Sequence, residues 1–199
     1  MMSRKKLFSV NTKPDHPFYQ NTDRKPFMTD LSHLSREEQK LLADVTLLVQ
    51  NDDQEFNYEM LKAAAPDEAS GEFWFRMAEM LSTLPPNQSL DLRMNGGRLT
   101  VAVSILSVLL QDNPDVPQLW AQKIIALNYL AHGHQTRAIG LAQQPDKAAE
   151  ANEEEYLAKA LSQNLLSTLK DAIERFPEDS WFIEMRDDAW KHFGPKEAV

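Results

Sequence analysis

Apolar side chains recur at three- and four-residue intervals along most of the chain, and this spacing constrains the fold more than any other feature of the sequence. In the segment after Ser35 one helical face would consist of Leu41, Leu42, Val45, Leu48 and Val49. Ser35 and Glu38 stand three residues apart just before this face, as in a capping box, in which each side chain accepts a hydrogen bond from the other residue's backbone N–H. The pattern therefore predicts an amphipathic helix that begins near Ser35.

Prolines, glycines and capping residues divide the rest of the chain into further helical segments. The predicted helices cover residues 56–65, 70–84, 98–114, 117–145, 153–177 and 180–194. We expect HGH at 132–134 to divide the segment 117–145 into two helices that turn at Gly133, and a less obvious division within 153–177. The FWF cluster at 73–75 should pack mostly into the core. The segments together predict an all-α fold of antiparallel helical hairpins in one domain, 31–199, preceded by a flexible basic arm, 1–30.

Three sets of residues in the second half have the spacing of the turn and packing positions of a helical repeat. They are Tyr129, Gly133 and Ala138; Gly97, Ala102 and Pro114; and Tyr156, Ala160, Leu165 and Pro177, with leucine where the repeat has alanine. Over about residues 88–194 the chain therefore resembles tetratricopeptide-repeat proteins, although its successive small residues lie 36 and 27 residues apart, whereas the family repeats every 34 or so. The resemblance implies hairpins stacked as a short repeat-like array, with a groove for a polypeptide.

The residues that carry chemistry in other proteins form no complete motif here. His132 and His134 are two positions apart and cannot converge on zinc as an i, i+4 pair does, so we predict no metal site and no cofactor. Cysteine is absent, no serine lies in a G-x-S-x-G or S-x-x-K motif, and NGGR at 95–98 lacks a phosphate loop's lysine and is expected to be a turn. The acidic runs at 150–156, 176–181 and 185–190 are typical of solvated faces. We therefore predict no catalytic residue.

Charge and composition exclude further classes of function. The net charge of −9 disfavours a nucleic-acid backbone as the main partner. Residues 1–30 differ from the rest, with six basic side chains against three acidic ones. The longest apolar run, 99–110, is shorter than the roughly 18 residues that a membrane span needs. Proline, lysine, aspartate and histidine interrupt any signal-peptide core near the start. These features predict a cytoplasmic protein without a membrane span.

The function expected on these grounds is protein binding. An acidic helical-repeat protein of this size resembles the secretion and assembly chaperones of bacteria in size and charge, which implies an adaptor or chaperone that holds a partner polypeptide. The candidates for partner contact are Phe18, Tyr19, Phe27, Trp74 and Trp181. The arm would provide a second contact or a homodimer interface. Two alternatives stay open: a structural subunit whose interface includes the exposed tryptophans Trp74, Trp181 and Trp190, and an enzyme whose pocket gathers His132, His134 and carboxylates.

Overall fold

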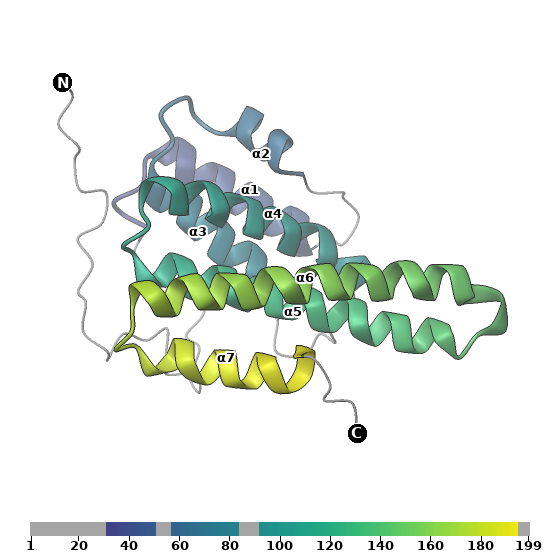
Figure 1. Ribbon diagram of the computed structural model, residues 1–199. Coiled ribbons are helices and arrows are strands. Elements are labelled where there is room, and N and C mark those ends of the chain that lie inside the picture. Colours follow the sequence, from purple (N-terminus) through teal and green to yellow (C-terminus); the bar gives the residue numbers. More distant parts are fainter. Residues whose placement is uncertain (1–30, 51–56, 84–91, 195–199) are drawn as a thin grey trace.

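The computed structural model describes residues 31–50, 57–83 and 92–194, and the regular elements within these ranges are all helices (Figure 1). In chain order they are α1 (Arg36–Gln50), α2 (Tyr58–Ala64), α3 (Gly71–Ser82), α4 (Leu92–Asp112), α5 (Pro117–Ala142), the 3-10 turn η1 (Pro145–Lys147), α6 (Ala148–Arg175) and α7 (Ser180–Phe193). The predicted all-α fold class is confirmed. The arm at 1–30, including Phe18, Tyr19 and Phe27, lies outside the described residues.

The start of α1 is the predicted capping box. The N–H of Ser35 donates to Glu38 Oε2 at 2.7 Å, and the N–H of Glu38 donates to Ser35 Oγ at 3.2 Å. The other carboxylate oxygen of Glu38 accepts the N–H of Ser70 at 2.7 Å, and Ser70 in turn caps α3 by accepting the N–H of Phe73. One buried carboxylate therefore joins the starts of two helices that are distant in sequence.

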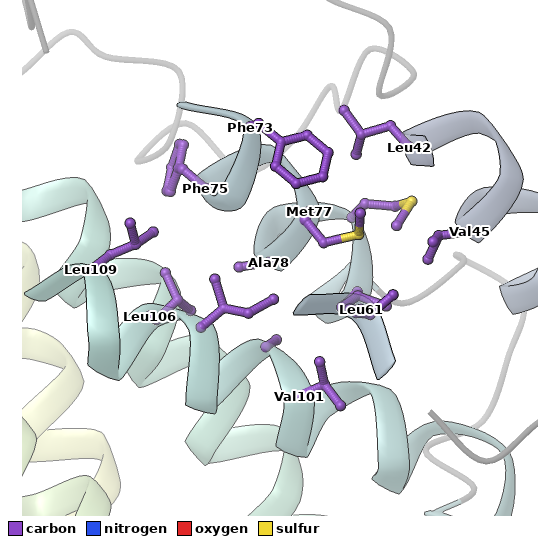
Figure 2. Close-up of a cluster of buried hydrophobic side chains, with 14 of the residues drawn as sticks. Leu42, Val45, Leu61, Phe73, Phe75, Met77, Ala78, Val101, Leu106 and Leu109 are labelled. Atoms are coloured by element: carbon purple, nitrogen blue, oxygen red, sulfur yellow. The ribbon is translucent and has the colours of Figure 1, made fainter. Parts of the chain in front are cut away.

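The larger hydrophobic cluster lies where α1, α3 and α4 meet (Figure 2). Its fully buried side chains include Phe73, Met77 and Leu81 of α3 and Leu106 of α4. The prediction that FWF packs mostly into the core is confirmed, because Phe73 and Phe75 are buried and Trp74 is half-buried. Burial of one such large side chain contributes about 1.5–3 kcal/mol.

A second cluster joins the three C-terminal helices. Ile124 and Leu127 of α5, Leu165 and Leu169 of α6, and Phe182 of α7 are all fully buried in it. The helices α5 and α6 run side by side over their length, and their distal ends extend beyond the other helices (Figure 1). No helix in the described ranges is both long and apolar enough to cross a membrane.

The predicted turns at Gly133 and at NGGR are wrong. The helix α5 continues from Pro117 to Ala142 through Gly133, and α4 begins at Leu92 and passes through residues 95–98. Likewise, α6 is one helix with no division. A glycine inside a helix costs only about 1 kcal/mol relative to alanine, and the packing of α5 on α6 exceeds this cost.

The positions that resemble the tetratricopeptide repeat fall inside single helices. Tyr129, Gly133 and Ala138 all lie on α5, where Gly133 and Ala138 are buried. The predicted small residue at a turn is here a small residue in a packed helix. Consecutive helices from α3 to α7 do contact one another, as in an array of hairpins. The family resemblance itself stays a prediction.

Candidate functional site

The two histidines that flank Gly133 point to different neighbours because they lie two positions apart on a continuous helix. Successive residues on an α-helix are rotated by about 100°, so an i, i+2 pair faces nearly opposite sides. His134 lies against Glu154 of α6, and His132 lies against His192 and Phe193 of α7. Both are half-buried, although the predicted turn at Gly133 would have placed them at exposed helix ends. They do not belong to one pocket, as the alternative of an enzyme site required.

Glu154 is the centre of the first of these clusters. Its Oε2 lies 2.6 Å from His134 Nδ1, and its Oε1 lies 3.1 Å from Arg137 Nε. Its two acidic neighbours, Glu153 and Glu155, are exposed as predicted, but Glu154 is buried in the seam between α5 and α6. The two partners compensate the carboxylate for its loss of water. The cluster therefore joins α5 and α6.

The chemistry available to this cluster is limited. A carboxylate beside an imidazole Nδ1 can orient the ring and leave Nε2 to act as a base, as in a catalytic triad. Such a base needs a neighbouring nucleophile and a cavity for substrate. Two surface hollows of the described residues are lined by other side chains: Arg186, Asp187, Trp190 and Lys191 line one on α7, and Trp120, Asp171, Glu174 and Arg175 line another. The arrangement favours a structural ion cluster.

The second cluster contains three aromatic rings. The ring centroid of His132 lies 4.7 Å from that of Phe193 and 5.2 Å from that of His192. His192 Nε2 is 3.8 Å from a carboxylate oxygen of Asp188 on the same helix. Burial lowers the pKa of His132, the nearby His192 lowers it further, and Asp188 partly offsets both effects.

Neither histidine cluster has the number of ligands that a metal site usually requires. Within the described ranges, no group of three or more His, Asp or Glu side chains is arranged to hold a metal ion. Zinc sites in proteins use at least three protein ligands. The cofactor prediction stays untested by this structure.

The tryptophans proposed for partner contact lie mostly at the margin of the core. Trp74 packs edge-on against Tyr58 and Phe73, with ring centroids 6.0 and 5.1 Å apart. Trp181 packs edge-on against Phe182. Both tryptophans are half-buried, whereas Trp190 exposes 55% of its surface beside charged side chains of α7. Of the three tryptophans, Trp190 therefore offers the largest apolar contact surface.

The sequence interpretation missed a set of exposed apolar side chains on the distal hairpin, by which we mean residues 134–157. Ile139 exposes 59% of its surface, Tyr156 exposes 72% and Leu157 exposes 37%. The signal was present in the spacing: Tyr156 falls between Glu154 and Ala158, which face the seam, and so points away from it. The mistaken turn at Gly133 hid this, because it ended the first helix before residue 139.

Searches for similarity detected no matching family model, no curated protein and no solved structure.

Proposed function

We propose that the protein is a non-catalytic adaptor or chaperone that binds a partner polypeptide, and that the distal hairpin is its contact surface. The observation that supports this best is the exposure of Ile139 and Tyr156 on two helices that extend beyond the rest of the fold. A contiguous exposed apolar patch marks a protein interaction site, and we take Ile139 and Tyr156 as parts of one such patch.

The charge of the distal hairpin indicates the kind of partner. Between residues 134 and 157, five acidic side chains stand against two basic ones. Complementary charge speeds association and discriminates against partners of the same sign. A basic, amphipathic segment of another protein fits this surface better than an acidic one. A cytoplasmic location belongs to the same proposal.

Affinity capture with matched surface variants tests this function. The full chain, the double variant Ile139→Ser/Tyr156→Ser and the control Leu47→Ser/Met60→Ser would each be used as bait in the native cytosol. Leu47 and Met60 are exposed to 59% and 57% but lie on α1 and α2, far along the chain from the hairpin. We expect one dominant polypeptide, in near-equal amount, with the wild type and the control, and its loss with the hairpin variant.

Two results would contradict the proposal. Recovery of the bait alone with all three proteins would contradict the proposal that the protein is an adaptor or chaperone. Equal recovery with the hairpin variant would move the contact away from Ile139 and Tyr156, and a chain lacking residues 1–30 would then test the arm. Self-association of the wild type without any other protein, measured by light scattering, would instead favour the structural-subunit alternative and an interface that includes Trp190.

A further inference from the structure

The two ends of α7 are attached to the fold in different ways. Near the first turn, Phe182 is fully buried and stacks on Phe176, with ring centroids 5.8 Å apart. At the last turn, Phe193 is only half-buried, and its ring lies against the imidazole of His132 on α5. The end of α7 therefore combines the apolar packing of Ala189 and Phe193 with a contact to a titratable group, whereas the first turn depends on apolar burial.

The surroundings of His132 do not favour a positive charge. The ring is half-buried against Phe193, and its other close aromatic neighbour is His192, which is itself able to become positive. Removing an imidazolium from water costs free energy, and a second one about 5 Å away would repel it. For both reasons the neutral ring fits the packed arrangement and the protonated ring does not.

Among the described residues, the titratable groups that act on His132 are His192 and Asp188 of α7. Asp188 lies 3.8 Å from His192 and attracts a proton to the pair, but it only partly offsets burial and the His192 charge. On the α6 side of α5, Glu154 is already bound to His134 and Arg137. The carboxylate of Glu154 is therefore committed to a different side of α5.

We propose that the contact of His132 with His192 and Phe193 is a pH-sensitive attachment, in which protonation of His132 releases the last turns of α7 from α5. Phe182 keeps the first turn in place, so the release is local. It exposes the Phe193 ring and the side of α5 that it covers.

The direction of the pH effect follows from proton linkage. Burial lowers the pKa of His132 in the packed state below its ordinary value of 6.5. The released state then binds more protons than the packed state as the pH falls through that value. Attachment is therefore complete above about pH 6.5 and weakens below it.

Amide hydrogen exchange on the full-length protein tests this at pH 7.5 and pH 5.5, with rates corrected for the intrinsic effect of pH. Between the two, we expect the opening constant of amides 189–193 to rise roughly three- to tenfold, while amides near Phe182 change little. An NMR titration of the His132 ring in the same sample should show a midpoint below that of a histidine in an unfolded peptide.

Variants separate this attachment from general acid sensitivity. His132→Gln removes the titration but keeps a polar side chain, and it should abolish the pH dependence at 189–193. The control His33→Gln removes a histidine near α1, on a different part of the fold, and should preserve it. An unchanged opening constant in the wild type, or a pH dependence that persists in His132→Gln, would overturn the proposal. A His132 midpoint at or above the peptide value would also overturn it, without relying on any variant.

Discussion

Glu38 Oε1 on α1 accepts the backbone N–H of Ser70, the residue that caps α3, at 2.7 Å. The same carboxylate closes the capping box of its own helix through Ser35. Charge-assisted hydrogen bonds of this kind are about twice as strong as neutral ones. Glu38 is therefore expected to hold α1 against α3 in addition to starting α1.

Replacing Glu38 with glutamine should destabilise the fold by about 1–3 kcal/mol, because the amide keeps one acceptor oxygen and turns a donor toward the other N–H. Urea denaturation at pH 7 measures the free energy of unfolding. Glu37→Gln is the matched control, because Glu37 is the preceding residue and is exposed. Equal effects of the two substitutions would show that the bond to Ser70 contributes nothing specific.

The stability of the fold should also decline in acid through the same carboxylate. Burial raises the pKa of Glu38, but the hydrogen bonds from Ser70 and Ser35 outweigh it and leave the pKa below the ordinary 4.5. A lowered pKa in the folded state gives stability that is present above about pH 4.5 and is lost as the pH falls through the folded value. The difference in unfolding free energy between wild type and Glu38→Gln should therefore shrink between pH 5 and pH 3. A constant difference would contradict this.

Two glycines provide a test of the helix boundaries near the ends of α5 and α7. A Cβ at Gly140 would meet no atom within 4 Å, whereas a Cβ at Gly194 would collide with the backbone oxygen of Trp190. Gly140→Ala should raise stability by about 0.5–1 kcal/mol, because alanine loses less conformational freedom in a helix. Gly194→Ala should lower it. Thermal unfolding would measure both, and a loss of stability in Gly140→Ala would contradict the extension of α5 to residue 142.

Substitution of Phe182 tests whether α7 unfolds in the same cooperative transition as α5 and α6. Its side chain is fully buried with Leu165 and Leu169, so Phe182→Ala should cost about 3–5 kcal/mol. Trp190→Ala removes a larger ring from a mostly exposed position and should change stability by less than about 1 kcal/mol. The global unfolding transition, followed by circular dichroism, should shift only for Phe182→Ala. A Phe182→Ala transition at the wild-type position would mean that α7 unfolds independently.

Local patterns were sufficient to predict the helices wherever a cap or a proline acts on its own neighbours. Ser35 and Glu38 mark the start of α1 because their hydrogen bonds join residues three positions apart. Pro66 and Pro177 follow the ends of α2 and α6 because proline restricts the residue before it. Such interactions depend on short stretches of chain, and the sequence contains all of their parts.

Contacts between distant helices decided the remaining features. Gly133 was predicted to turn, and it lies inside α5 because α6, more than ten residues away, packs along the whole helix. The same continuity separates His132 from His134 and leaves Ile139 exposed on the distal hairpin. The sequence by itself determined an all-α chain and most helix ends, since these follow from spacing and capping. Only the tertiary structure decided which of the predicted helix breaks form and which polar side chains are buried. The free energy that determines both comes from packing against the partner helix.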